Sequence, residues 1–517
     1  MKAIKFKDKK ITRWVMLSLL SVFILSCSLS TTVAIQPEIV QPAITLPPAA
    51  PELITPIQQR SDFVEIDPTI DSLPPIIQSS PTAHPPLLYY TQSGDTLSSI
   101  SVRFNVAQNE ISSTAAEIPQ DSLLKPGLLL IIPDRLDETS PETLLLPDSE
   151  VVNSPSSLDF NLYDFIQNTD GYLKTYREYR SEGWFTGAEI VDRVAIENSI
   201  SPRLLLAILE HESHWVYGQP LNLSQQDYPI GWVDFHDKGL YKQLSWAVQQ
   251  LSIGYYGWRA GLVCQLQFPT GETMQISPQL NAGTVALQYL YSALYDLPDW
   301  TTRLYGSDNL INLYQDMFGN PWDRAQTVEP LYPPNLTQPF LELPFRAGRT
   351  WSLTGGPHSA WGPDGALAAL DFAPMMSEHG CVETDDWVTA ISPGLVVRSE
   401  YGAVLVDLDG DGREQTGWVI LYMHIATNGR VQEGTWVNTN DLIGHPSCEG
   451  GVSTGTHLHI ARKYNGEWIL ADGPLPFVLD GWQAHAGDAP YLGTLEKDGQ
   501  IVQASQYGSF ESRISRP

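Results

Sequence analysis

The chain has 517 residues, which is too many for one hydrophobic core, so we expect three or four folded units. Its formal net charge is −29. A charge of this sign and size argues against a nucleic-acid partner and against charge-driven binding to anionic polymers. The 15 Trp and 22 Tyr residues suit proteins that stack on sugar rings, although composition alone does not prove that use.

Residues 1–27 have the pattern of a signal peptide. Basic side chains between Lys2 and Arg13 precede an apolar run from Trp14 to Leu25, which is shorter than the ~20 residues that a membrane-spanning helix needs. The run ends in Ile-Leu-Ser-Cys27, which resembles the lipobox of bacterial lipoproteins. We therefore expect an extracytoplasmic protein of the bacterial cell envelope, with a lipid anchor at Cys27, ordinary secretion or an uncleaved anchor as the alternatives.

Residues 28–87 contain 12 prolines and no glycine. Such a segment cannot bury enough apolar surface to fold, so we predict a disordered, stiff tether. At ~3.1 Å per residue it could reach at most about 190 Å, a length useful for crossing an envelope layer.

Residues 88–134 carry the signals of a small α+β domain. A short strand and a Ser-Gly-Asp-Thr turn precede a helix, and a second short helix over Gln108–Ser113 precedes the strand Leu128–Ile132. This βααβ order, with the words YTQSGDTLSSISVRFNV and LKPGLLLIIP, resembles the LysM module. LysM modules bind glycans that contain N-acetylglucosamine, so the resemblance implies peptidoglycan or chitin as a partner. The alternative is a small packing domain.

Residues 135–158 read as an acidic linker, and residues 159–343 as a mostly helical domain without strand alternation. Thr186 opens a capping box with Glu189, and Ser201 is predicted to cap the next helix. On that helix Glu212 continues an apolar stripe, so we expect it to be desolvated, with a raised pKa that suits a general acid.

The sequence SPRLLLAILEHESHW, which contains Glu212, resembles the catalytic helix of soluble lytic transglycosylases. The resemblance implies a lysozyme-like or transglycosylase-like domain in which Glu212 cleaves glycan strands. A later Gly-Leu-x-x-Gln-Leu turn carries one residue more than the pattern of that family. The alternative is a helical spacer or a domain that only holds glycan.

Residues 344–517 change to short strands with Gly and Asp turns, the pattern of a mostly β domain. His457 and His459 lie two residues apart on a predicted strand and therefore face the same side. His358 follows a Gly-Gly-Pro turn, Asp371 lies in Ala-Leu-Asp-Phe, and His424 ends an alternating strand. Two imidazoles and a carboxylate can hold Zn²⁺ and leave one coordination position open, which is typical of a catalytic site.

These motifs resemble the lysostaphin-like zinc endopeptidases, most closely their β-lytic branch, in which a loop separates the first His from the Asp. The resemblance implies that His358, Asp371 and His459 bind zinc and that His424 and His457 flank the scissile bond. Bound zinc would lower the pKa of water toward ~7, and the two other imidazoles would handle the proton and the oxyanion.

The four cysteines include Cys27, and the sequence alone does not choose a pairing among the other three. The resemblance to the β-lytic branch implies a disulfide between Cys381 and Cys448. The remaining cysteine is then unpaired.

Asp407, Asp409 and Asp411 alternate as in a calcium loop, but Trp418 stands where a closing Glu belongs. A tight acidic hairpin turn explains the pattern equally well. Both alternatives stay open at this stage.

Together these features predict a peptidoglycan hydrolase: a zinc metalloendopeptidase that cuts cross-links or stem peptides and is targeted by LysM binding to glycan. The alternatives are a bifunctional enzyme with Glu212-dependent glycan cleavage and a non-catalytic regulator that binds the wall. Reducing or anhydro glycan ends released by a Glu212→Gln-sensitive activity would separate the first alternative. An assay on peptidoglycan with and without a chelator, comparing the wild type with His459→Ala, would separate the second.

Overall fold

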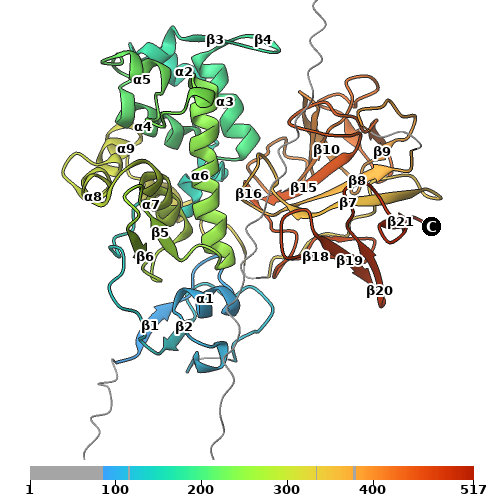
Figure 1. Ribbon diagram of the computed structural model, residues 1–517, viewed down its shortest axis with the longest axis horizontal. Helices are drawn as coiled ribbons and strands as arrows, with labels where there is room; N and C mark the ends of the chain where they lie inside the picture. The colour runs from blue at the N-terminus through green and yellow to red at the C-terminus, as the bar shows by residue number, and fades with distance from the viewer. Residues whose placement is uncertain (1–84, 115–116, 334, 377–379) are drawn as a thin grey trace, which may run out of the picture. The chain divides into compact units, whose positions relative to one another are not determined.

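The computed structural model describes residues 85–114, 117–333, 335–376 and 380–517, which belong to one compact unit of the chain (Figure 1). The predicted signal segment, the lipobox at Cys27 and nearly all of the predicted tether lie outside the described residues. Within the described ranges, no helix combines the length and the apolar character that crossing a membrane requires.

The first domain has the predicted βααβ order. Strand β1 (Leu87–Tyr90) pairs antiparallel with β2 (Leu129–Ile132), and α1 (Leu97–Arg103) precedes a single 3-10 turn (Gln108–Glu110). The predicted second helix is shorter than expected because the backbone becomes extended at Ile111. Apolar side chains from α1, from both strands and from the loops between them form a separate small core. Local pattern therefore predicted this domain well.

The prediction of a linker over residues 135–158 is wrong for its second part, from residue 145 onward. Leu145, Leu146, Val151 and Val152 are at most 3% exposed and belong to the core of the helical domain. The 3-10 turns Asp148–Glu150 and Pro155–Ser157 shape this segment. Its acidic composition wrongly indicates a solvated linker, because two of its acidic side chains are buried against basic residues far along the sequence.

Two acidic residues of this segment form buried ion pairs. Asp148 accepts a hydrogen bond from Arg259 at 2.8 Å, and Glu150 pairs with Arg324 at 2.9 Å. Paired carboxylates can be buried at acceptable cost, whereas unpaired ones cannot. Composition counts the charges and does not reveal such partners.

The second domain is mostly helical, as predicted, with two short hairpins that the sequence did not indicate. Their strands have three or four residues, which is too short for a clear alternation. The helices are α2 (Leu162–Gln167), α3 (Gly187–Asn198), α4 (Pro202–Ser213), α5 (Leu223–Asp227), α6 (Leu240–Ala260), α7 (Ala282–Leu294), α8 (Leu297–Tyr305), α9 (Leu310–Phe318) and α10 (Pro321–Val328). The hairpins are β3 (Arg177–Arg180) with β4 (Gly183–Thr186), and β5 (Gln265–Gln267) with β6 (Thr273–Gln275).

The two helix starts predicted in this domain have different outcomes. The capping box of Thr186 and Glu189 forms at the start of α3, as predicted. Ser201 precedes α4, with Pro202 in its first turn, but the Ser201 hydroxyl makes no capping hydrogen bond. The position of the helix start was therefore right, and the expected capping contact of Ser201 was wrong.

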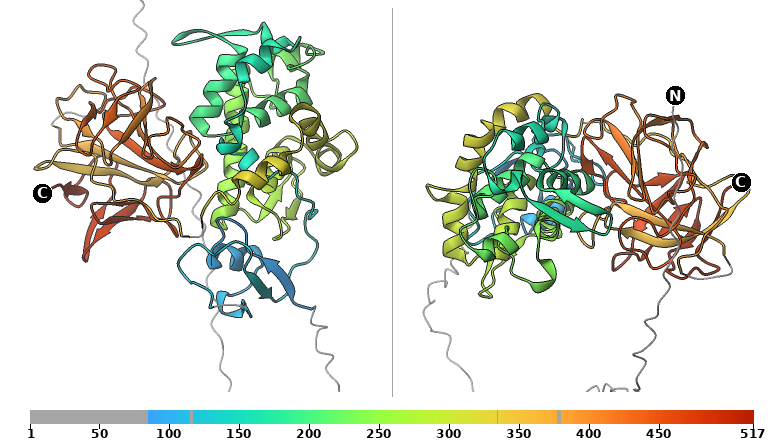
Figure 2. Two further views of the ribbon diagram at one scale, coloured as in Figure 1. Left: turned by 180° about the vertical axis from the view of Figure 1, so that it is seen from behind. Right: turned by 90° about the horizontal axis from the view of Figure 1, so that it is seen from above.

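The third domain contains a large sheet of antiparallel pairs in the order β13-β10-β11-β12-β15-β8-β7-β21, with β16 paired to β15. The strands of this domain are the arrows coloured from yellow-orange to red in Figure 2. Its strands are β7 (Thr350–His358), β8 (Ala369–Pro374), β10 (Gly394–Glu400), β11 (Ala403–Asp407), β12 (Trp418–Met423), β13 (Trp436–Val437), β15 (Leu458–Tyr464), β16 (Glu467–Trp468) and β21 (Arg513–Ser515).

Two smaller sheets complete the third domain. One pairs β9 (Val388–Thr389) with β14 (Leu442–Gly444). The other contains β17 (Val478–Leu479), β18 (Trp482–Ala486), β19 (Gly493–Lys497) and β20 (Gln500–Gln503). These four strands lie in residues 472–517, a C-terminal extension in which the sequence shows no recognisable motif.

The two faces of the large sheet are buried against different partners. Leu370 and Ile460 face one way and belong to a core made by the third domain alone. Ala369 and Ala461 face the other way and join the core cluster that also contains the helices of the second domain. Successive residues of a strand alternate between faces, so odd-numbered residues of β8 and β15 share the second face. Asp371 and His459 are among them.

Candidate metal centre

Three neighbouring strands bring His358, Asp371 and His459 together. In the antiparallel ladder of β15 and β8, His459 lies directly opposite Asp371. Directly opposed side chains on one face of a sheet have Cβ atoms about 4.5–5.5 Å apart. His358 is the last residue of β7, the strand on the other side of β8. The sheet register therefore gathers residues that lie up to a hundred positions apart in the sequence.

The three side chains direct their polar atoms at one another. His358 Nε2 lies 3.0 Å from His459 Nδ1 and 3.2 Å from Asp371 Oδ1, and His459 Nδ1 lies 3.2 Å from the same carboxylate oxygen. All three residues are at most 7% exposed. Two ring nitrogens and a carboxylate oxygen thus converge on one buried point.

The opposite nitrogen of each ring has a backbone partner. His358 Nδ1 donates to the carbonyl of Gly356 at 2.8 Å, and His459 Nε2 donates to the carbonyl of Ala360 at 3.0 Å. A carbonyl oxygen can only accept, so these nitrogens carry the protons. In the neutral rings the inward nitrogens then present lone pairs beside a carboxylate, and such a donor set fits a divalent cation.

The surroundings of the three residues explain two local sequence features. A Cβ atom at Gly355 would lie 2.7 Å from Asp371 Oδ2, so only glycine lets β7 approach the carboxylate this closely. The ring of Tyr491 stacks on His358 with centroids 4.1 Å apart. Tyr491 comes from the C-terminal extension, and nothing in its sequence context indicated a place beside the metal centre.

His424 and His457 form a second pair beside the three residues, with ring centroids 4.4 Å apart. His424 Nδ1 donates to the carbonyl of Glu449 at 3.0 Å, and His457 Nδ1 donates to the carbonyl of Gly455 at 2.7 Å. Each ring therefore keeps Nε2 for other partners, and His457 Nε2 lies 3.7 Å from Asp371 Oδ1. The non-glycine residue His424 has a positive φ of 64°, a constrained backbone conformation that is found at functional sites.

The pKa values of these groups follow from burial and from the Asp371 charge. Burial alone would raise the pKa of Asp371, but the charges and hydrogen bonds of the neighbouring imidazoles hold it well below its usual range. Burial would lower the pKa of His358, but the Asp371 carboxylate outweighs this and raises it. Burial lowers the pKa of His459, and burial with the two nearby imidazoles lowers that of His424 to about 3, so His424 is neutral at physiological pH.

The disulfide that the family resemblance implied is present. Cys381 and Cys448 are joined, and Cys448 immediately precedes Glu449, whose carbonyl accepts from His424. The bond therefore fixes the loop that orients this histidine. Among the described cysteines, Cys264 is unpaired, and burial raises the pKa of its thiol.

Comparison with known proteins finds family models that match the first two domains and relatives that are peptidases. A family model of the LysM domain matches residues 89–133, and a model of the LasA N-terminal domain matches residues 144–333. The beta-lytic metalloendopeptidase of Achromobacter lyticus is 28% identical over 160 residues, which are 29% of this chain and 40% of that protein. The chain is thus similar in sequence to the beta-lytic metalloendopeptidases. The LysM prediction is confirmed, and the match to the LasA N-terminal model begins at residue 144, inside the segment that the sequence predicted as a linker.

Two further relatives extend this result. Protease LasA of Pseudomonas aeruginosa is 25% identical over 301 residues, 53% of this chain and 65% of that protein. The beta-lytic metalloendopeptidase of Lysobacter enzymogenes is 27% identical over 160 residues, 29% of this chain and 83% of that protein. The chain thus spans less than two thirds of the length of the first two relatives. Among solved structures, the M23 metalloprotease pseudoalterin from the deep sea is similar at 23% identity. The match covers 32% of this chain and 96% of pseudoalterin, with a TM-score of 0.27.

Glu212 does not have the environment that the sequence predicted. Its side chain is 2% exposed, as the apolar stripe implied, but Arg303 donates to both of its oxygens at 3.0 Å. His211 Nδ1 lies 2.8 Å from one oxygen, and Tyr295 donates to the other. Burial would raise the pKa of Glu212, but these partners outweigh it and lower the pKa below its usual value. The expected raised pKa was wrong, so the prediction of a general acid loses its physical basis.

Asp407, Asp409 and Asp411 lie close together at the turn after β11, within 4.8 Å of one another by one carboxylate oxygen each. Their oxygens accept hydrogen bonds from backbone N–H groups of the same turn, such as Gly412 N to Asp407 at 2.9 Å. Burial raises the pKa of Asp407 to about 6. An acidic turn stabilised by its own backbone explains the pattern, and the calcium alternative stays a prediction.

Proposed function

We propose that the protein is a zinc metalloendopeptidase that hydrolyses peptide bonds of peptidoglycan, in cross-links or stem peptides. The observation that carries the proposal is the buried convergence of His358, Asp371 and His459, with no Lys or Arg side chain among the described residues paired to the carboxylate. A negatively charged donor set of this kind needs a cation, and two nitrogens with one oxygen suit zinc. The similarity to beta-lytic metalloendopeptidases supports the same choice.

The residues of the chain have separate parts in the proposed reaction. His358, Asp371 and His459 hold the metal, and the carbonyls of Gly356 and Ala360 fix the orientation of the two rings. When bound, zinc supplies Lewis acidity that acidifies water and polarises a peptide carbonyl.

The proton transfers are assigned to the second histidine pair. His424 is neutral and holds its proton on Nδ1, so Nε2 can accept a proton from the attacking water. His457 holds Nδ1 on the Gly455 carbonyl and therefore has Nε2 free to hydrogen-bond the oxyanion that develops on the substrate. The carbonyl of Glu449 and the carbonyl of Gly455 keep the two rings in these orientations.

The LysM domain supplies the second element of the proposal, a grip on the glycan. LysM binding to N-acetylglucosamine-containing strands would raise the local concentration of peptide substrate for the metalloendopeptidase. This use requires the protein to act outside the cytoplasm, in keeping with the signal-peptide pattern, and we extend the proposal to a lipid anchor at Cys27.

The test uses the purified protein on peptidoglycan and measures newly released amino termini. We expect release by the wild type, loss of release with a zinc chelator, and recovery on adding zinc. His459→Ala should lose both bound zinc and release. A wild type that binds zinc but releases no amino termini would instead support the non-catalytic wall-binding regulator.

A further inference from the structure

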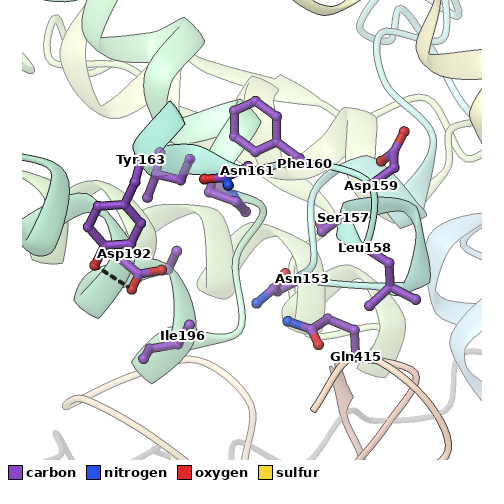
Figure 3. Close-up of a pocket in the computed structure, with 13 residues that line it drawn as sticks. Asn153, Ser157, Leu158, Asp159, Phe160, Asn161, Tyr163, Asp192, Ile196 and Gln415 are labelled. Carbon is purple, nitrogen blue, oxygen red and sulfur yellow. Dashed lines mark hydrogen bonds between the residues drawn. The ribbon is translucent and has the colours of Figure 1, made fainter. Parts of the chain in front are cut away.

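A second pocket shares no residue with the metal centre and lies almost wholly in the second domain (Figure 3). It encloses about 430 Å³. All but one of its lining residues fall between residues 153 and 202, in the segment that reads as linker in the sequence and in the helices after it. The lining residues are Asn153, Ser157, Leu158, Asp159, Phe160, Asn161, Leu162, Tyr163, Asp192, Ala195, Ile196, Pro202 and Gln415.

Two buried polar side chains at this pocket lack partners. Asn153 is 4% exposed, and its Oδ1 accepts no hydrogen bond from any described residue. Ser157 is 8% exposed, and its hydroxyl is equally unpartnered within the described chain. Buried polar atoms nearly always have a partner, so exceptions call for an explanation. Figure 3 shows the Asn153 side chain between the Tyr163–Asp192 pair and Gln415.

The lining also contains the carboxylate of Asp192, whose hydrogen-bond donor is the neutral hydroxyl of Tyr163. Asp192 accepts a hydrogen bond from the Tyr163 hydroxyl at 2.9 Å, and burial raises the pKa of Asp192. Asp159, the other acid of the lining, is already paired with Arg203 at 2.6 Å. The lining contains no Lys or Arg. These groups disfavour an anion and favour a ligand that presents several hydrogen-bond donors.

We propose that this pocket binds a sugar unit of an N-acetylated glycan. Amide, hydroxyl and carboxylate groups can pair with sugar hydroxyls and with an N-acetyl amide, and the ring of Tyr163 offers an apolar face. The volume lies within the range of about 300–1,000 Å³ that is usual for small-ligand sites. The choice of a wall glycan as the source of the sugar rests on the proposed function.

A glycan contact here would be a second grip, in addition to the LysM domain. Two weak contacts on one strand bind together far more tightly than either alone, provided that the strand reaches both. The inference thus deepens the proposed targeting and makes no use of the metal centre.

The test is hydrogen–deuterium exchange of the full-length protein with and without triacetylchitotriose. We expect slower exchange in peptides that cover residues 153–163 and 192–202, in addition to any protection within residues 88–134. Asn153→Leu removes the unpartnered amide at similar volume, and Asp192→Asn keeps the shape and removes the charge. Each should weaken binding at this pocket at least tenfold. Asp316→Asn, an exposed acid on α9 outside the lining, is the matched control and should leave binding unchanged.

Three results would overturn the proposal. One is protection confined to residues 88–134. Another is protection of residues 153–163 that survives both Asn153→Leu and Asp192→Asn. The third is protection by a cationic amine such as lysinamide in place of the sugar. Asp192→Asn serves as the deciding variant if Asn153→Leu does not fold. Chelator-sensitive release of amino termini by the wild type is measured separately, so the metalloendopeptidase proposal stands or fails independently.

Discussion

The metal centre and the surroundings of Glu212 are both buried clusters of histidine and carboxylate, yet they have opposite chemistry. At Glu212 the protein supplies its own cation, because Arg303 donates to both carboxylate oxygens. At Asp371 the neighbours are imidazoles whose outward nitrogens are held by backbone carbonyls. A buried carboxylate that a guanidinium already neutralises is a structural element, whereas one surrounded by imidazoles, which can present lone pairs, can share a cation with them.

The largest expected effect comes from replacing each of the two carboxylates, Asp371 and Glu212, by its amide. Asp371→Asn removes the charge that holds the metal, so release of amino termini should fall on the order of 10⁴-fold or more, with loss of bound zinc. Glu212→Gln should leave both quantities unchanged. Zinc content by elemental analysis and release from peptidoglycan check both variants. Loss of zinc-dependent release in Glu212→Gln would break the comparison.

The next effect tests the second histidine pair within the metal domain. His424→Ala should retain zinc, because His424 is not among the three converging groups, but should lower kcat by roughly 10²- to 10³-fold through loss of the proton acceptor. Single-turnover release of amino termini by the zinc-loaded variant measures this. If the variant binds no zinc, His424 acts on metal binding and not on proton transfer.

A smaller effect concerns folding of the helical domain. Glu212→Gln breaks the ion pair with Arg303, so the free energy of unfolding should fall by about 2–4 kcal/mol. Arg303 is partly exposed, which keeps the expected loss at the lower end of that range. Urea denaturation followed by tryptophan fluorescence gives the value. Asp316→Asn, on the exposed surface of α9, should change stability by no more than about 0.5 kcal/mol.

The smallest effect is a pH dependence. The pKa of Glu212 is lower in the folded chain than in the unfolded chain, so the folded state binds fewer protons. Its contribution to stability is therefore complete above the unfolded pKa of about 4.5 and is lost as the pH falls through the folded value. Between pH 5 and pH 3 the wild type should lose more stability than Glu212→Gln does. Parallel pH profiles of the two proteins would show that Glu212 carries no such charge stabilisation.

The same two regions show where reasoning from the sequence succeeds and where it fails. The His-Leu-His word on a strand, the Gly-Gly-Pro-His turn and Ala-Leu-Asp-Phe are short, specific patterns, and the period of a strand already places His457 and His459 on one side. The prediction for Glu212 rested on an apolar stripe along its helix, and this stripe correctly predicted that the side chain is buried. Its pKa depended on Arg303, ninety-one positions away, which no local pattern reveals.

The linker prediction failed for a related reason. Asp148 and Glu150 look solvated in the sequence, and their partners Arg259 and Arg324 lie more than a hundred residues further on. The sequence also gave no indication that Tyr491 stacks on His358. Such a contact depends on the tertiary fold, and the C-terminal extension contains no motif that would predict it.

The sequence by itself determined the order of the domains, the LysM unit, the mostly helical and mostly β classes, and the candidate metal ligands, because these depend on local periodicity and short motifs. The tertiary structure alone decided which charges are neutralised, which carbonyls orient the imidazoles, and which polar groups are buried without partners. Those properties depend on contacts between segments distant along the chain, and hydrogen bonds and ion pairs are strong enough to reverse the pKa shift that burial alone would cause.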